Sequence, residues 1–153
     1  MNNLSLRIAD FADEPFLRDL CFDVRRDEFG LAGLPEAALN TLLTIQYAAQ
    51  KQSYESNYPE AENSIIELED EKVGRLLITR DEGKIHLVDI AILRGFRGRG
   101  IGSVVLGRLK SEAEMIGLSV FKTNFGAINL YQRHGFKVVR DNEAYFEMEW
   151  ENA

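Results

Sequence analysis

The run at residues 97–102, Arg-Gly-Arg-Gly-Ile-Gly, constrains the fold more than any other part of the sequence. It lies between a strand-like segment, residues 85–93, and a segment with apolar residues at helical spacing, residues 101–116. Glycines let the backbone come close to a ligand, and the first amides of the following helix have no acceptor within the helix. The helix dipole and two arginines add positive charge. The sequence therefore predicts a strand–loop–helix unit whose loop binds phosphate.

Other glycine-rich motifs do not fit this run. A Walker A loop needs a lysine, whereas Gly102 is followed by Ser103 and Val104. A dinucleotide-binding loop needs a third glycine where Ser103 stands, in a unit that opens the sheet. An RNA-binding tail of the RGG type is disordered and repetitive, whereas this run is single and flanked by apolar segments. The remaining alternative is a strand–helix connection without a ligand.

Two spacings resemble those of one known family. The pattern R-x-x-G-x-G at residues 97–102 resembles the acyl-CoA loop of the GNAT acetyltransferase superfamily. The pattern N-x-x-A-x-x-L-Y at residues 124–131, followed by Gly-Phe at 135–136, resembles its second signature. Residues 87–92 resemble the fourth strand of that family. The resemblance covers residues 85–136, about a third of the chain.

The periodicity along the chain predicts alternating strands and helices in the order of that family. Helices are expected at 15–28, 35–56, 101–116 and 127–134, and strands at 4–8, 64–69, 72–80, 85–93, 118–122, 136–140 and 144–150. The resemblance implies an α/β GNAT fold in a single domain, residues 1–153, with a mixed, twisted sheet of about seven strands and about four helices on both faces. It also implies that the fourth and fifth strands splay apart and admit the pantetheine arm of CoA.

Composition narrows the function classes. The formal net charge of −7 argues against binding to nucleic acid and mildly favours a cationic acceptor. The sequence has no apolar run long enough to span a membrane, and its first residues do not resemble a signal peptide. The single cysteine, Cys21, fits a cytoplasmic protein and lies on an apolar helical stripe, so we expect a buried thiol. The two histidines, His86 and His134, have no partners at metal-ligand spacing.

The resemblance implies acetyl-CoA as co-substrate, and no metal. The main chain of the fourth strand would pair with pantetheine, and the loop amides would hold the pyrophosphate, with Asn124 and Tyr131 near the thioester end. Ile90 and Ile92 are also ordinary core positions, and Asn124 is also suited to capping the next helix. The expected cofactor-binding residues are Ile90, Ala91, Ile92, Arg97, Gly98, Arg99, Gly100, Ile101, Gly102, Ser103, Asn124 and Tyr131.

The candidate catalytic residues are Tyr131, His86 and Asp89. Tyr131 matches the family's tyrosine and would protonate the departing thiolate; its alternative role is that of a core tyrosine. His86 or Asp89 would deprotonate the amine, and a histidine has the better pKa for this near neutral pH. Strand alternation places His86 on one face and Asp89 on the other, unless a bulge intervenes. A solvent-facing strand histidine is the alternative for His86.

The sequence thus predicts an acetyl-CoA-dependent N-acetyltransferase that acetylates a primary amine of a small molecule or peptide by direct attack. Gln46, Gln50 and Tyr54 form a polar helical stripe suited to lining the acceptor cleft. A homodimer is compatible with the sequence, whereas a nucleic-acid or membrane partner is not expected. The alternative is a non-catalytic module with the same fold that binds or senses acyl-CoA.

Overall fold

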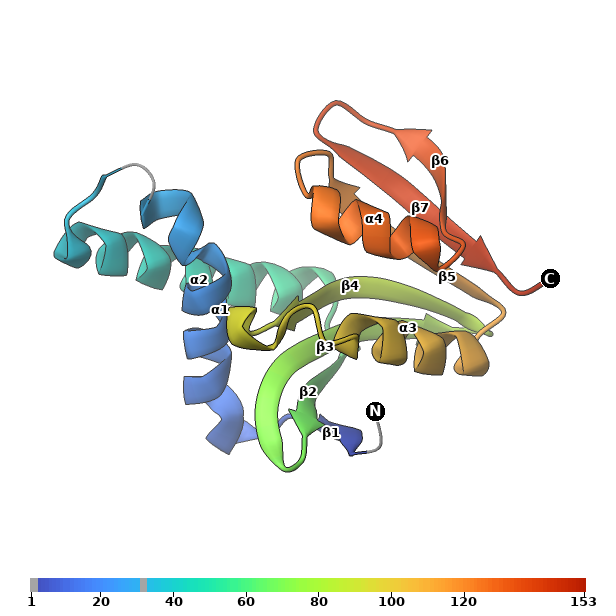
Figure 1. The fold of residues 1–153 in the computed structure, drawn as a ribbon, viewed down its shortest axis with the longest axis horizontal. Coiled ribbons are helices and arrows are strands. Elements are labelled where there is room, and N and C mark those ends of the chain that lie inside the picture. The colour runs from blue at the N-terminus through green and yellow to red at the C-terminus, as the bar shows by residue number, and fades with distance from the viewer. Residues whose placement is uncertain (1–2, 31–32) are drawn as a thin grey trace.

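The computed structural model describes residues 3–30 and 33–153 (Figure 1). A seven-stranded sheet in the order β1-β2-β3-β4-β5-β7-β6 forms its centre. The elements in chain order are β1 (Leu4–Ile8), η1 (Phe11–Asp13), α1 (Glu14–Gly30), α2 (Glu36–Asn57), β2 (Glu62–Leu68), β3 (Glu71–Asp81), β4 (Lys84–Ile92), η2 (Arg94–Phe96), α3 (Ile101–Glu112), β5 (Met115–Phe121), α4 (Phe125–Arg133), β6 (Lys137–Asp141) and β7 (Tyr145–Glu151). The predicted α/β fold, with its mixed sheet and four α-helices, is confirmed.

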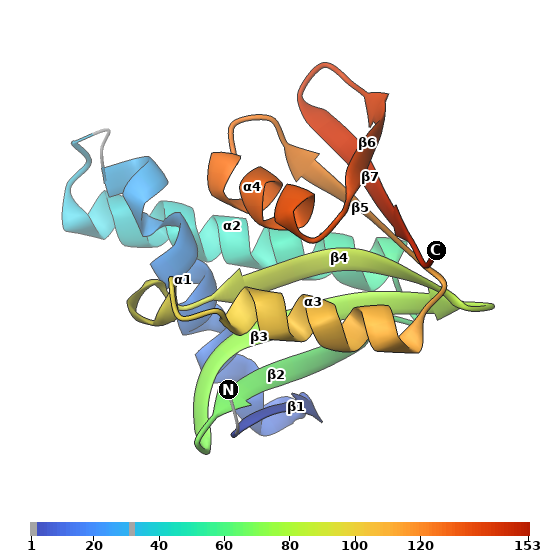
Figure 2. The same ribbon diagram turned by 45° about the vertical axis from the view of Figure 1, so that its right-hand side comes forward.

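The helices lie on both faces of the sheet. Helices α3 and α4 cover one face, and α1 and α2 lie on the other (Figures 1 and 2). The main core lies under α3, where Val105, Leu106 and Leu109 are at most 1% exposed. Burial of each such side chain contributes about 1.5–3 kcal/mol. The site is therefore built on a rigid support.

Helix α1 buries the chain's only cysteine. Leu17, Leu20 and Cys21 are buried on one stripe of this helix, as its apolar spacing predicts. Burial raises the pKa of the Cys21 thiol. Cys21 is therefore a core residue, and this expectation is confirmed.

The predicted helix over residues 101–116 was too long. Helix α3 ends at Glu112, and Ala113 is already extended, with φ −139° and ψ 154°. The N–H of Glu114 donates to the carbonyl of Gly83 at 2.8 Å, and its own carbonyl accepts from Asn152 at 2.8 Å. These bonds replace the helical ones. Gly117, expected to end the helix, lies within β5.

The pairing of β4 with β5 stops halfway along both strands. These parallel strands pair from Lys84 beside Met115 to Leu87 beside Leu118. Residues 88–92 and 119–121 lie beyond the last pair, and the two strands diverge there (Figure 2). The splay that the family resemblance implied is present.

The length and hydropathy of a helix decide whether it is able to span a membrane. Within residues 3–30 and 33–153, none of the helices is long and apolar enough to cross a membrane.

Candidate functional site

The glycine-rich loop joins β4 to α3 and presents free backbone amides. Gly98 and Gly100 have φ values of +77° and +82°, which favour glycine. Gly100 caps α3 without a side-chain hydrogen bond, and its carbonyl accepts from Val104 at 3.1 Å. The backbone amides of residues 101–103, which come before this first helical hydrogen bond, have no acceptor within the helix. The loop therefore has the backbone geometry that favours an anion at the start of a helix.

Contacts with neighbouring elements hold this loop. The backbone N–H of Arg94 donates to Asp23 of α1 at 2.8 Å. Arg97 donates from Nε to the carbonyl of Ile92 at 3.3 Å, and the Arg99 guanidinium lies 4.9 Å from the centroid of the Phe96 ring. Both Arg97 and Arg99 are exposed, so their charge remains available to a ligand.

The end of β4 offers backbone groups on one edge. Ile90, Ala91 and Ile92 pair with β3 on one side and lie beyond the last pair with β5 on the other. Ile90 and Ile92 also pack against the core. Their side chains therefore serve the core, while the β5-facing edge of their backbone lacks a strand partner.

A β-bulge places His86 and Asp89 on the same face of the sheet. Asp89 pairs with Leu77, His86 pairs with Thr79, and the register shift leaves Val88 as an extra residue between them. Leu77 and Thr79 are two residues apart and share a face, and paired residues share a face too. Strict alternation would place Asp89 opposite His86; the bulge that was named as the exception is present, and its extra residue reverses the alternation.

The same bulge changes the face of the sheet on which the side chains at the end of β4 lie. Ile90 and Ile92, which strict alternation would place on the face of His86, pack against the core cluster that α3 covers. His86 instead stacks on Tyr58 at the end of α2, and Asp89 pairs with Arg75, whose guanidinium lies near Tyr54 of α2. The two candidate bases thus stand together, away from the main core.

Asp89 forms an ion pair with Arg75 of β3. The Arg75 guanidinium also lies 5.3 Å from the centroid of the Tyr54 ring on α2. Burial raises the pKa of Tyr54 to about 12, and the charge of Asp89 acts in the same direction. Gln46, Gln50 and Tyr54 are all half-buried, so the stripe predicted on α2 lies along this face.

His86 is half-buried beside a pocket. Its ring stacks on that of Tyr58, with centroids 5.7 Å apart and an interplanar angle of 26°. Burial lowers the pKa of His86 from its ordinary 6.5, and the carboxylate of Glu147 partly opposes this effect. A neutral imidazole is able to accept a proton at neutral pH.

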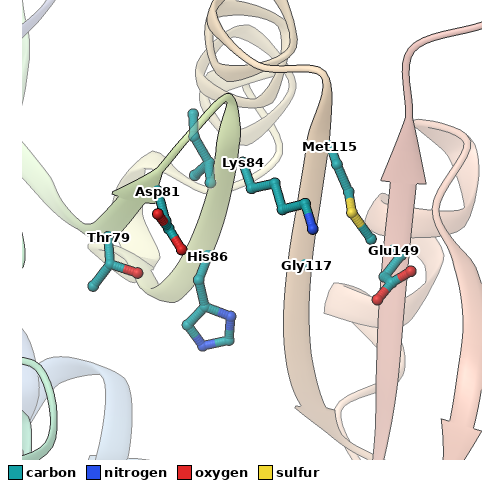
Figure 3. A pocket seen from close by; sticks show the side chains of 8 residues that line it. Thr79, Asp81, Lys84, His86, Met115, Gly117 and Glu149 are labelled. Atoms are coloured by element: carbon teal, nitrogen blue, oxygen red, sulfur yellow. The ribbon is translucent and has the colours of Figure 1, made fainter.

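The pocket beside His86 has a volume of about 370 Å³. Figure 3 shows Lys84 and His86 of β4 and Glu149 of β7 on either side of Gly117. It is lined by Thr79, Asp81, Lys84, Ile85, His86, Met115, Gly117 and Glu149. The absence of a side chain at Gly117 leaves the floor of this pocket open.

Tyr131 is buried where the strands part. It is 6% exposed and its ring lies 5.6 Å from that of Phe136. Burial raises the pKa of Tyr131 well above its ordinary value, and the carboxylate of Asp89 adds to the effect. The phenol stays protonated at neutral pH and is able to donate.

Asn124 and His134 occupy the two ends of α4. Asn124 accepts from the N–H of Ala127 at 3.2 Å, so the capping role considered for it is present. His134 stands at the C-terminal cap, and its Nε2 lies 3.0 Å from the Oγ of Ser103. This contact ties α4 to the loop at the start of α3.

Three residues of this site belong to none of the sequence motifs. Arg75, Tyr58 and Glu147 come from β3, the end of α2 and β7. Of the three, only Arg75 is recognisable in the sequence, because it is a charged residue within the otherwise apolar run of residues 73–78. Tyr58 and Glu147 follow no pattern that distinguishes them from surface residues. Among the described residues, no group of three or more His, Cys, Asp or Glu side chains is placed to hold a metal ion.

Comparison with known proteins agrees with this geometry. A model of the acetyltransferase (GNAT) family matches residues 31–136. A curated N-alpha-acetyltransferase of Sulfurisphaera tokodaii is 39% identical over 69 residues, which is 41% of this chain and 41% of that protein. The match thus spans less than half the length of this relative.

Solved structures share the fold. The PaiA N-acetyltransferase of Thermoplasma acidophilum, in complex with coenzyme A, has a TM-score of 0.73 at 16% identity, over 97% of this chain and 99% of that chain. The N-acetyltransferase PseH of Campylobacter jejuni, in complex with acetyl coenzyme A, has a TM-score of 0.62 at 11% identity, over 98% and 99% of the two chains. At these identities the likeness concerns the fold alone.

The stacking of Tyr58 on His86 generates a testable prediction. Replacing Tyr58 with Ala exposes the imidazole, so the pKa of His86 should rise toward or above its ordinary 6.5. Titration of the imidazole C–H signals by NMR measures this directly. Tyr47→Ala is the control: Tyr47 of α2 donates its hydroxyl hydrogen to Glu14 of α1, so its loss should leave the His86 titration unchanged. An unaltered His86 titration in Tyr58→Ala would contradict the prediction.

Proposed function

Because the chain belongs to the acetyltransferase (GNAT) family, we propose that it transfers the acetyl group of acetyl-CoA to a primary amine of a small molecule or peptide. The observation that carries the proposal is the grouping at the parted strands. Asp89 lies on the unpaired part of β4, and His86 shares its face from the last paired residues of the strand, while the protonated Tyr131 comes from α4. Two of the similar structures hold coenzyme A or acetyl coenzyme A, which supports the same ligand here.

The proposed cofactor site has three parts. The loop from Arg97 to Ser103 receives the pyrophosphate on its amides, and its two arginines add charge. The free edge at Ile90, Ala91 and Ile92 pairs with the pantetheine amides as a further strand would. The Asn124 side-chain nitrogen, which the cap does not use, is a third donor.

The proposed reaction removes two protons from the acceptor nitrogen and adds one to the departing sulfur. The acceptor arrives as an ammonium ion and gives a proton to neutral His86, directly or through one water. The amine nitrogen then forms a bond to the thioester carbon, and the C–S bond breaks as the tetrahedral intermediate collapses. Tyr131 gives its proton to the departing sulfur, which becomes the CoA thiol, and the second proton that the nitrogen loses on becoming an amide restores the Tyr131 phenol, directly or through water. Asp89 supplies negative charge that attracts the ammonium ion, and it is the second candidate for the base.

The competing proposal is a non-catalytic module that binds acyl-CoA. It requires the loop and the β4 edge but not Tyr131 or His86. A protonated buried phenol at Tyr131 and a neutral imidazole at His86 favour the enzyme.

The loop assignment predicts the effect of a side chain at Gly100. A Cβ there meets no protein atom within 4 Å, so Gly100→Val obstructs the amide surface and strains the positive φ. We expect CoA affinity in calorimetry to fall about tenfold or more, a loss of about 1.4 kcal/mol. Gly107→Val is the matched control, since Gly107 also has open space but lies on the exposed side of α3. Gly102 is a poorer choice, because its Cβ would lie 3.0 Å from Leu130. Native CoA affinity in a folded Gly100→Val protein would remove the loop from the site.

Thiol release from acetyl-CoA, measured against a panel of primary amines and peptides, tests the proposed function. Native protein should release CoA with at least one acceptor and yield an acetylated amine by mass spectrometry. Tyr131→Phe keeps the packing on Phe136 and removes the acid, so single-turnover rates should fall by roughly 10²–10⁴ with acetyl-CoA affinity unchanged. A native single-turnover rate in Tyr131→Phe would exclude the acid role. Acetyl-CoA binding with no acetylated product across the panel would favour the non-catalytic module.

A further inference from the structure

Arg75 is a charged residue in a position that otherwise suits an apolar one. It lies in the middle of β3, between Gly74 and Leu76, and is 9% exposed. Its Nε is buried and has no hydrogen-bond partner among the described residues. A guanidinium loses its hydration on burial, and an unpaired N–H adds to that cost.

Stability does not explain why this position holds an arginine. Buried ion pairs are often no more stabilising than well-packed apolar side chains of similar volume, because desolvation offsets the attraction. The contacts of Arg75 suggest a different reason. One nitrogen of its guanidinium bonds Asp89 Oδ2, and the Tyr54 ring lies against the guanidinium.

These contacts fix the orientation of Asp89. The guanidinium contacts both the Tyr54 ring and Asp89 Oδ2, so it restrains the direction in which the carboxylate points. Its other oxygen, Oδ1, has no hydrogen bond to a described residue, and the side chain is 24% exposed. Asp89 is thus a carboxylate with one oxygen occupied and the other available.

Asp89 stands where a positively charged acceptor would arrive. It belongs to the part of β4 beyond the last pair with β5, and its charge reaches the Tyr131 hydroxyl. A fixed, partly desolvated carboxylate attracts an ammonium ion more strongly than a mobile exposed one, since it loses less freedom on binding. A neutral acceptor would gain nothing from this arrangement.

We infer that Arg75 is a positioning residue for acceptor binding: it holds the Asp89 carboxylate so that Oδ1 receives the ammonium group of a cationic primary amine. This inference rests on the proposed acetyl transfer and assigns Asp89 to acceptor recognition, leaving the proton to His86. Arg75 itself touches neither substrate.

Kinetics of Arg75 variants test the inference, with the primary amine that native protein acetylates best. Arg75→Met removes the charge and keeps most of the volume. We expect the KM for the amine to rise about tenfold, while the KM for acetyl-CoA and the single-turnover rate at saturating amine stay native. Arg75→Lys keeps a cation within reach of Asp89 and should recover most of the affinity. A merely structural arginine would lower the melting temperature without this split between the two KM values.

Two further variants complete the design. Asp89→Asn should raise the amine KM as Arg75→Met does, and the double variant should be no worse than Asp89→Asn alone, because both changes remove the same interaction. Arg80→Met is the control: Arg80 lies on the same strand and pairs with Glu62 and Glu112, away from Asp89. Its kinetics should be native. If Arg75→Met does not fold, Arg75→Gln takes its place under the same criteria.

The outcomes separate this inference from the proposed function. A native amine KM in folded Arg75→Met, or equal increases in both KM values, overturns the positioning role while native activity stands. Additive effects of the two substitutions would also contradict it. If native protein acetylates no amine on the panel, the proposed function fails, and the inference fails with it.

Discussion

The site depends on the end of pairing between β4 and β5 at Leu87 and Leu118. Backbone N–H and C=O groups inside a protein need partners, and two strands that part leave a row of them unpaired. A ligand with its own amides is able to supply those partners, as a further strand would. The same parting brings Tyr131, from the helical layer of α4, within electrostatic reach of Asp89 on the opposite face. Cofactor binding and proton transfer would thus share one structural cause.

The bulge at Val88 is the second constraint. Without it, His86 and Asp89 would face opposite sides of the sheet, and only one of them would lie on the side of α2. With it, two groups of different chemistry face the same region: a half-buried neutral imidazole and a carboxylate fixed by Arg75. In the proposed reaction, attraction of the acceptor's charge falls to Asp89 and removal of its proton falls to His86.

Much of this arrangement was predictable from local sequence. The glycines of residues 97–102 indicated the loop, and the spacing from Asn124 to Tyr131 indicated the helix that carries the tyrosine. The face of Asp89 was not predictable, because one extra residue reverses a period of two and leaves no trace in composition. The predicted end of α3 was too late because Ala113 and Ile116 continue the helical spacing of apolar residues. The backbone of Glu114 instead hydrogen-bonds residues that are distant in sequence. The Arg75–Asp89 pair and the Tyr58–His86 stack join different elements, which periodicity does not reveal.

A crystal structure of the protein with acetyl-CoA tests the central claim most directly. The account predicts that the pantetheine arm passes between β4 and β5 beyond Leu87 and Leu118, hydrogen-bonded to the backbone of residues 90–92. The thioester sulfur should lie within hydrogen-bond distance of the Tyr131 hydroxyl, with the acetyl carbon open to the face of His86 and Asp89. Acetyl-CoA bound away from the parted strands, or with its sulfur remote from Tyr131, would contradict the account.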